Sequence, residues 1–400
     1  MKILMASSYF ASHNGGLERV AGELFRAFAD RGEEIVWMAG DVTAAPDSVG
    51  RSRTVSLRIF NFLEGRTGIP FPIPAPSTLR QIVREVKDAD ILILHDCLYL
   101  SNILTFLVAR IYRVPTVIIQ HTRYFPNESP LVNAVIKACT SIVTKPMLSQ
   151  ASQVVFIGET TKDFFSGLHF KRPPEVIFNG VNTDVFRKLE ETETIPALRH
   201  QYELPEEDVV ILFVGRFVTK KGLSVMKRMV RIRPNWTWAF AGWGPLDPTQ
   251  WNAPNVRVFS GLSGLSLAPL YRCCDLLVLP SSGEGGFPLV AREALASGIP
   301  VVCSKETLGG DPAITEFVTG APVYPLDEGA TAREFVIAIE KSLGCGIKLK
   351  ENSPQSKTIA ALQNSWYQAA DQYIGIISSL VPQKALKHTK SEISAERRCG

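Results

Sequence analysis

Two cations that follow a buried strand are the first residues whose chemistry suggests a ligand site. Residues 214–222 read Val-Gly-Arg-Phe-Val-Thr-Lys-Lys-Gly, so the strand ends at Gly215, and Arg216 and Lys221 follow five residues apart. Fixed cations stabilise the negative charge that develops on a diphosphate when a bond to it breaks. The guanidinium is a planar fork and the ammonium a point charge, so the two are not redundant. The alternative is solvated surface charge.

A glycine-rich loop between a strand and a helix is the second candidate. Residues 280–294 read Pro-Ser-Ser-Gly-Glu-Gly-Gly-Phe-Pro-Leu-Val-Ala-Arg-Glu-Ala. Free N–H groups and the helix dipole at such a helix start form an anion site for a phosphate. The carboxylates of Glu284 and Glu293 suit sugar hydroxyls, and Glu293 is near enough to the loop to meet a ribose. The alternative, a turn with an ordinary helix-capping acid, is disfavoured because the loop accompanies the two cations.

Two further turns carry a weaker signal. Asn14-Gly15-Gly16 lies between a strand and a helix, where glycines let a backbone approach a ligand closely. It lacks the Gly-x-Gly-x-x-Gly spacing of dinucleotide binders, so the NAD interpretation is weak. Asn179-Gly180 follows a strand and predicts a hinge between domains.

Polar residues at strand ends extend the candidate set. His121 follows the strand expected at Thr116–Gln120. A lone histidine is more often a core residue, but a place at a carboxyl end strengthens the case for a functional role. His95 and Asp96 follow another strand, where a structural role and acceptor binding are equally favoured. Asp88-Ala89-Asp90 resembles a metal-binding Asp-x-Asp, but it precedes a strand and is interpreted as a loop.

Short apolar runs that alternate with amphipathic stretches predict the elements that hold these residues. Continuous Val, Ile and Leu runs are typical of parallel strands covered on both faces, and ligands bind beyond the carboxyl ends of such strands. The pattern restarts near Phe178–Phe186, so we expect an α/β chain of two Rossmann-like, doubly wound domains facing a cleft. Strands are expected at Ile3–Ala6, Ile35–Ala39, Ile91–Leu94, Thr116–Gln120, Val154–Ile157, Glu175–Ile177, Val209–Val214, Trp238–Ala241, Val256–Phe259, Leu276–Leu279 and Val301–Cys303. Helices are expected at Leu17–Asp30, Leu79–Val86, Ser101–Tyr112, Leu223–Val230, Leu267–Tyr271, Val290–Ala296 and Thr358–Leu380.

The domain boundaries follow from the same pattern. We expect an N-terminal Rossmann-like domain at 1–178, a C-terminal Rossmann-like domain at 179–365 and a C-terminal helix at about 366–382. The remaining tail, 383–400, is polar with little to bury and is expected to be disordered.

The composition is that of a globular protein without a disulfide frame. The chain has 400 residues, of which 46% are hydrophobic and 20% charged, and its net charge is +4. This net charge is far below that of a typical nucleic-acid-binding protein. It suits an enzyme that holds a diphosphate or works near an anionic membrane. The alternative is that the net charge carries no information about function. The seven cysteines include no Cys-x-x-Cys pair, which indicates free thiols in a reducing compartment rather than disulfides or a zinc site.

Neither a signal peptide nor a membrane span is expected. The apolar run of Met1–Ser8 is too short for a secretion signal and reads as a buried strand, and no run of about 18 apolar residues occurs. We therefore expect a cytoplasmic protein. The irregular segment Arg51–Pro76 interleaves arginines with large apolar residues, which predicts contact with the inner face of a membrane or a lipid-linked acceptor. The alternative is a loop packed on its own domain.

Taken together, these segments resemble the retaining glycosyltransferases called family 4, which have the GT-B fold. The glycine loop near the start, Asn179-Gly180-Val181, Val-Gly-Arg with Lys221-Gly222, Gly242-x-Gly244-Pro245 and the stretch ending at Glu293-Ala294 all occur in the family's order. The match runs from about residue 3 to residue 375, most of the chain. The resemblance also implies that the C-terminal helix crosses back to complete the first domain.

The resemblance implies roles for the candidates. Arg216 and Lys221 would bind the donor diphosphate, Glu293 the ribose and Glu284 the transferred sugar. His121 would touch the sugar near the reacting carbon. The implied donor-binding set is Gly15, Gly16, Gly215, Arg216, Lys221, Gly261, Leu262, Glu284, Gly285, Gly286, Phe287, Pro288, Leu289 and Glu293, and the implied catalytic set is His121, Arg216, Lys221 and Glu284.

Two positions depart from the family pattern. The family usually has seven residues between its two glutamates, whereas eight lie between Glu284 and Glu293 here, so either Glu284 or Gly285 occupies the first acidic position. Asn182 stands where the family commonly has Asp, which weakens any role for that residue.

The implied reaction is transfer of a sugar from a UDP- or GDP-sugar to a saccharide or lipid-linked acceptor in bacterial polysaccharide or glycolipid assembly. Its path is oxocarbenium-like with retention, and the leaving phosphate helps to deprotonate the acceptor. No cofactor or metal is expected, because Arg216 and Lys221 would stabilise the charge. A non-catalytic nucleotide- or sugar-binding protein and a sugar-nucleotide epimerase on the same fold are the alternatives.

Overall fold

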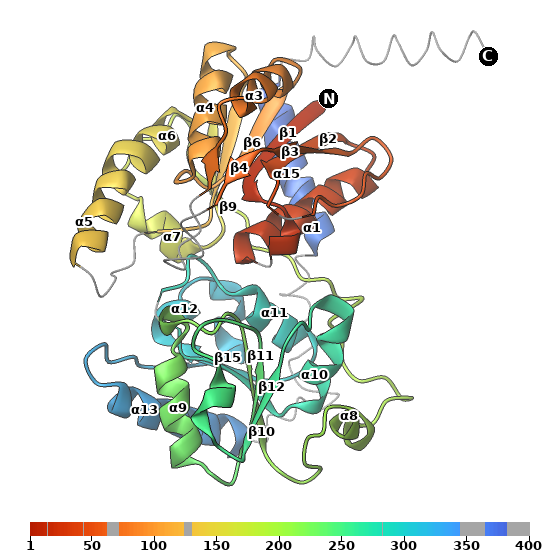
Figure 1. The fold of residues 1–400 in the computed structure, drawn as a ribbon, viewed down its shortest axis with the longest axis vertical. Coiled ribbons are helices and arrows are strands. Elements are labelled where there is room, and N and C mark those ends of the chain that lie inside the picture. The colour runs from red at the N-terminus through yellow and green to blue at the C-terminus, as the bar shows by residue number, and fades with distance from the viewer. Residues whose placement is uncertain are drawn as a thin grey trace. The chain divides into compact units, whose positions relative to one another are not determined.

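The chain divides into two compact units, each with its own parallel sheet (Figure 1). The computed structural model describes residues 1–400 except Asn14, Thr43, 62–71, 124–129, Ser282, 345–364 and 382–400, together with the side chains of 130–132 and Glu316. The first unit is Met1–Ile177 with the C-terminal segment that begins at Trp366, and the second is Phe178–Ser365.

The sheet of the first unit has the strand order β3-β2-β1-β6-β7-β8-β9, with every neighbouring pair parallel. Side chains such as those of Ile3, Ile93 and Ile119 are fully buried, as expected for strands covered on both faces. The strands are β1 (Lys2–Tyr9), β2 (Glu34–Gly40), β3 (Arg53–Leu57), β6 (Ile91–His95), β7 (Thr116–Gln120), β8 (Gln153–Phe156) and β9 (Glu175–Val176), and β4 (Ile59–Phe60) and β5 (Ile73–Pro74) form a separate antiparallel pair.

The helix α1 of the first unit buries one face. On α1, the apolar residues Val20, Leu24 and Phe28 recur at helical spacing and are almost fully buried. The helix α15 lies beside α1 although more than 300 residues separate them, and Tyr367 donates to Asp30 while Arg31 pairs with Asp371. The helices are α1 (Gly16–Asp30), α3 (Thr78–Lys87), α4 (Leu100–Ile111), α5 (Pro130–Cys139), α6 (Lys145–Gln150), α7 (Glu159–Phe164) and α15 (Trp366–Leu380).

The sheet of the second unit has the order β12-β11-β10-β13-β14-β15 and is also parallel. Its strands are β10 (Val210–Val214), β11 (Thr237–Ala241), β12 (Val256–Phe259), β13 (Leu276–Leu279), β14 (Val301–Ser304) and β15 (Val318–Ala321). Its helices are α8 (Ile195–Gln201), α9 (Leu223–Ile232), α10 (Ala268–Cys273), α11 (Leu289–Ala296), α12 (Lys305–Leu308) and α13 (Glu328–Gly344).

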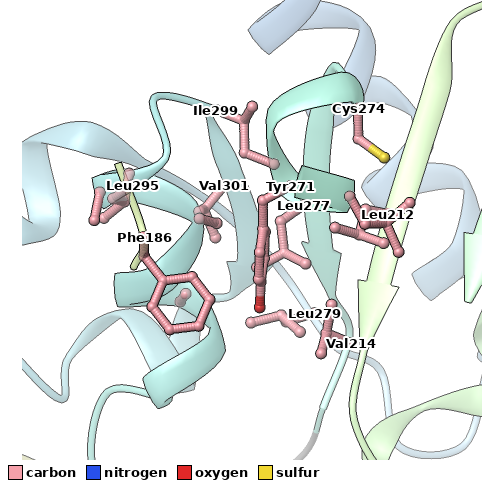
Figure 2. Close-up of a cluster of buried hydrophobic side chains, with 14 of the residues drawn as sticks. Phe186, Leu212, Val214, Tyr271, Cys274, Leu277, Leu279, Leu295, Ile299 and Val301 are labelled. Atoms are coloured by element: carbon pink, nitrogen blue, oxygen red, sulfur yellow. The ribbon is translucent and has the colours of Figure 1, made fainter. Parts of the chain in front are cut away.

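Hydrophobic clusters lie on both faces of this second sheet. Leu212 of β10 packs with residues of α10 and α11 on one face, whereas Ile211 and Phe213 pack with α9 and α13 on the other. Figure 2 shows the first cluster, in which the Phe186 ring meets the Tyr271 ring edge-on at 5.8 Å between centroids. Because successive side chains of β10 point to opposite faces of the sheet, this one strand packs against helices on both faces.

The predicted fold class is confirmed, with two Rossmann-like units each built on a parallel sheet. The prediction that Arg51–Pro76 is irregular was wrong at its start, where Arg53–Leu57 forms the edge strand β3 with Val55 and Leu57 buried. Neither β15 nor α13 was predicted from the sequence. Of the helix expected at Thr358–Leu380, the part before Ser365 lies outside the described residues, as does the tail 383–400.

Two expectations from composition concern cysteines and membrane spans. Cys97, Cys273, Cys274 and Cys303 are buried free thiols, and Cys139 is a free, exposed one. Cys345 and Cys399 lie outside the described residues. In the part of the chain that the structure describes, none of the helices combines the length and apolar character needed to span a membrane.

Candidate functional site

The second sheet has a topological switch point between β10 and β13. The chain passes from β10 through α9 to β11 on one side, while β13 joins β10 on the other side. The loops that leave these two strands therefore diverge at their carboxyl ends, where parallel sheets bind ligands. The cation loop after β10 and the glycine-rich loop after β13 are those two loops.

A cation from one loop and a carboxylate from the other meet at this point. The Lys221 ammonium donates to Glu284 Oε1 at 2.5 Å, and the two side chains are 25% and 15% exposed. Burial alone would raise the pKa of Glu284, but the Lys221 charge and its hydrogen bond outweigh burial and hold that pKa below its ordinary value. Glu284 is therefore ionised at neutral pH and its carboxylate faces the cation loop.

Gly222 makes this approach sterically feasible. Its φ of +77° is left-handed, and a Cβ at this position would lie 2.5 Å from the carbonyl oxygen of Pro280. The backbones of the two loops are therefore in contact immediately beside the Lys221–Glu284 pair.

Arg216 is held by the loop that follows β11. Its guanidinium lies over the Trp243 ring, 4.9 Å from the centroid, and Phe217 N–H donates to the Trp243 carbonyl at 2.7 Å. Gly242 lies so close to the Gly215 carbonyl that a Cβ would be 2.0 Å from its oxygen. Among the described residues, none is a hydrogen-bond partner of the buried Arg216 Nε, so at that atom the charge is stacked rather than ion-paired.

Glu293 lies inside α11 and is only 3% exposed. The hydroxyl of Tyr271, itself fully buried, donates to Glu293 Oε2 at 2.9 Å. Tyr271 thus orients the carboxylate that is expected to meet a ribose. The sequence analysis listed Tyr271 only as a helix residue, and its spacing carried no sign of this contact.

A buried ion pair supports the glycine-rich loop. Arg292 is 1% exposed, pairs with Asp311 and lies 6.0 Å from the centroid of the Phe287 ring. Gly310 approaches the same loop, since a Cβ there would lie 2.7 Å from the Phe287 nitrogen. The expected phosphate-contacting backbone at Gly286 and Phe287 is therefore positioned by residues that the sequence analysis did not name.

The other expected donor contacts in the second unit are backbone positions. Pro288 is the N-cap of α11 and Leu289 its first residue, with no side chain capping the helix start. Gly261 has a φ of +77° and open space where a Cβ would be, while Leu262 packs against the core. Glu284 brings the carboxylate that pairs with Lys221, and whether Glu284 or Gly285 occupies the first acidic position of the motif stays a prediction.

The first unit has its own switch point, between β1 and β6, and Gly15 and Gly16 follow β1 there. Gly15 is the N-cap of α1, and a Cβ on it would collide with the Glu18 carboxylate at 1.9 Å. Gly16 begins the helix, and no heavy atom of the residues that the structure describes lies within 4 Å of a Cβ placed there. Of the two glycines, Gly16 therefore leaves room for a ligand.

His121 lies beside His95 at the ends of β7 and β6. His95 Nδ1 and His121 Nε2 are 3.0 Å apart, and the residues are 0% and 5% exposed. Burial lowers the pKa of His121 to about 3, and burial together with His121 lowers that of His95 well below its ordinary value. Both rings are neutral at physiological pH.

The hydrogen bonds of Asp96 support a structural role for this residue. Its carboxylate accepts hydrogen bonds from the Cys97 backbone, Gln120 and Thr122 at 2.7 to 3.0 Å, and its φ of +67° is left-handed. These contacts tie the end of β6 to the end of β7. Asp88 and Asp90 anchor the chain start, since Asp88 pairs with the Lys2 ammonium and Asp90 accepts from the Lys2 backbone.

Asn179-Gly180 leads into Asn182, whose Oδ1 accepts from the backbones of Asp184 and Val185 at 3.1 and 3.3 Å. Asn182 thus closes a local turn, which an aspartate at this position would close in the same way. Whether the segment acts as a hinge stays a prediction.

Comparison with known proteins places these motifs in one family. The family description "Glycosyltransferase Family 4" matches residues 14–185, and "Glycosyl transferases group 1" matches residues 208–341. The chain belongs to the family 4 glycosyltransferases. Both loops of the second-unit switch point lie within the second match, and His121 lies within the first.

Two curated relatives are 28 to 32% identical to this family 4 chain over the aligned residues. It is 32% identical over 197 residues to an uncharacterized glycosyltransferase of Methanocaldococcus jannaschii, covering 46% of this chain and 50% of that protein. It is 28% identical over 236 residues to a D-inositol 3-phosphate glycosyltransferase of Corynebacterium kroppenstedtii, covering 53% and 52%. The chain thus spans about half the length of these curated relatives.

Solved structures show the same fold over nearly the whole chain. The complex of Anabaena HepE with UDP-glucose has a TM-score of 0.68 at 18% identity, covering 95% of this chain and all of that one. Sucrose-phosphate synthase from Thermosynechococcus elongatus has a TM-score of 0.62 at 17% identity and covers both chains fully. This likeness establishes the GT-B fold.

Proposed function

We propose that this chain transfers a sugar from a UDP- or GDP-sugar to a saccharide or lipid-linked acceptor and retains the anomeric configuration. We place the reaction in bacterial polysaccharide or glycolipid assembly. Family membership supports a glycosyl transfer, and the relatives named D-inositol 3-phosphate glycosyltransferase support a polar acceptor. The Anabaena complexes with UDP and UDP-glucose support a nucleotide-sugar donor.

The observation that carries the proposal is the Lys221–Glu284 pair at the second-unit switch point. An ammonium has three N–H donors, and Glu284 Oε1 takes one of them. The others serve the diphosphate oxygens, while the remaining lone pairs of the ionised carboxylate accept from sugar hydroxyls. The Lys221–Glu284 pair would thus contact both the diphosphate and the sugar, the two groups joined by the bond that breaks.

In the proposed step, the bond between the anomeric carbon and the diphosphate oxygen breaks, and the nucleoside diphosphate leaves with the electron pair. The acceptor oxygen bonds to the same face of that carbon, and its proton passes to the leaving phosphate. Lys221 and the stacked Arg216 stabilise the developing negative charge. We expect turnover without an added divalent metal. Activity assays in an excess of chelator test this expectation.

Incubation with a panel of UDP-, GDP- and ADP-sugars tests the function. We expect one donor to raise the melting temperature and to release its nucleoside diphosphate when an acceptor is present. NMR of the product's anomeric proton then reports retention. Binding without release in a broad acceptor panel would favour a non-catalytic binding protein, and conversion of the donor sugar without acceptor would favour an epimerase.

Membrane contact through Arg51–Pro76 is a separate proposal. Arg51 pairs with Glu34 and Arg53 with Glu85, whereas Arg58 and Phe60 are exposed; residues 62–71 lie outside the described residues. Flotation with anionic liposomes tests it. Equal flotation of the chain and a variant with these arginines neutralised would contradict the proposal.

A further inference from the structure

Two buried imidazoles share one hydrogen bond at the carboxyl ends of β6 and β7 in the first unit. His95 and His121 end neighbouring strand segments, and their rings are nearly parallel, with 25° between planes and 5.2 Å between centroids. The bond joins His95 Nδ1 to His121 Nε2 at 3.0 Å. Because burial keeps both rings neutral, one of the two nitrogens donates and the other accepts.

His95 is fixed in place by its backbone as well as by its ring. Asn102 Nδ2 donates to the His95 carbonyl at 2.7 Å, and the main chain of β6 pairs with β7 through His95 opposite Ile119. The nearby Asp96 carboxylate accepts from Cys97, Gln120 and Thr122. The ring of His95 therefore has one described polar partner, His121.

The other nitrogen of His95 decides between the two tautomers. His95 Nε2 is buried and has no hydrogen-bond partner in the described part of the chain. If His121 were the donor, neutral His95 would carry its hydrogen on Nε2 and bury an N–H with nothing to accept it. If His95 is the donor, only a lone pair is left unpaired, and buried orphan N–H groups are the rarer outcome in folded proteins.

We infer that His95 is a positioning residue that donates from Nδ1 to His121 Nε2 and so fixes His121 as the tautomer with its hydrogen on Nδ1. His121 then offers a neutral N–H donor and no free lone pair. Its ligand is an oxygen acceptor, such as a sugar hydroxyl or a phosphate oxygen, and it does not act as a general base. The assignment of the ligand depends on the proposed function, whereas the assignment of the His121 tautomer does not.

Nitrogen-15 NMR of the histidine rings tests the tautomer without any substrate. The chain has six histidines, and loss of a signal set in His121→Gln and in His95→Asn assigns the two rings. At pH 7 we expect His121 Nδ1 to be of the protonated type and His121 Nε2 of the unprotonated type. The reverse pattern, or a ring protonated at both nitrogens, would overturn the inference.

Two variants at His95 separate positioning from packing. The amide nitrogen of His95→Asn can occupy the place of Nδ1 and donate, whereas His95→Leu has a similar bulk and no donor. We expect His95→Asn to keep the His121 tautomer and kcat within about threefold, and His95→Leu to give mixed tautomers and a kcat about tenfold lower with an unchanged donor KM.

An unchanged tautomer in a folded His95→Leu protein would overturn the inference even if kcat fell. If His95→Leu does not fold, the wild-type spectrum decides alone. Should the chain turn over no donor, the proposed function fails while the ring spectra still report on His95.

Discussion

Lys221 and Glu284 come from positions 63 residues apart and share one short hydrogen bond. Their residue types and their places after two strands were visible in the sequence, and both were predicted as site residues. Their contact was not, since it depends on Gly222 letting two loop backbones touch. Side-chain chemistry was thus predictable where a strand end positions it.

Partners that orient the site residues were missed at this scale. His95 was named without its bond to His121, and neither Trp243 beside Arg216 nor Tyr271 beside Glu293 was given a role. An aromatic residue in an apolar run looks the same whether it fills a core or holds a charge. Only the three-dimensional neighbours distinguish the two.

Gly16→Ala tests whether a ligand approaches the start of α1. The added methyl meets open space, so we expect unchanged or slightly higher stability, by up to about 1 kcal/mol, because alanine favours a helix. We expect donor affinity to fall at least about tenfold by steric exclusion. Gly375→Ala, also a helical glycine with open space, is the control and keeps wild-type affinity. Calorimetric titration measures the donor affinity of each variant. Equal affinities of Gly16→Ala and Gly375→Ala would contradict a close approach of the ligand to Gly16.

His121 makes stability depend on pH below neutrality. Its pKa is about 3 in the folded chain and 6.5 ordinarily, so the unfolded state binds the proton more readily. The stabilisation is complete above pH 6.5 and is lost as pH falls towards 3, by about 2 kcal/mol at pH 5. Urea unfolding at pH 7.5 and 5.0 should show a smaller loss in His121→Gln. The same loss in both proteins would rule this out.

At the scale of elements, the β10 and β11 loops and the glycine-rich loop act together around the switch point. Gly222→Ala should place a methyl against the Pro280 carbonyl, whereas Gly261→Ala has the same φ of +77° and open space. Both variants carry left-handed strain of about 1 kcal/mol, and we expect Gly222→Ala to cost about 1 to 3 kcal/mol more. Comparison of melting curves checks this, and matching losses would show that the loops do not need the close approach.

Elements with strong apolar runs were predicted almost to the residue. β7 and β12 have the expected bounds, and α1 begins one residue before the expected Leu17. The edge strands β3 and β15 were missed, because β3 begins with Arg53 and is only partly buried, and β15 contains Gly320. Weak strands depend on a neighbour in the sheet, which composition does not reveal.

At the scale of the whole chain, α15 returns to the first unit and packs beside α1. Ile377 is fully buried, whereas Asp371 forms a surface pair with Arg31 and is 59% exposed. We expect Ile377→Ala to lower the free energy of unfolding by about 2 to 5 kcal/mol and Asp371→Ala by less than about 1 kcal/mol. Scanning calorimetry distinguishes them, and comparable small effects would mean that α15 contributes little to the unit.

Each of the two sheets has a switch point at which loops carry the candidate site residues. The loop with Arg216 and Lys221 belongs to the second unit. Titration of UDP and GDP into the wild-type chain and Lys221→Ala, with Gly375→Ala as a folded control, tests this assignment most directly. We expect micromolar-range binding of one nucleotide that weakens at least about tenfold in Lys221→Ala and is unchanged in Gly375→Ala. Equal affinity of the wild-type chain and Lys221→Ala for that nucleotide would contradict a diphosphate site at Lys221.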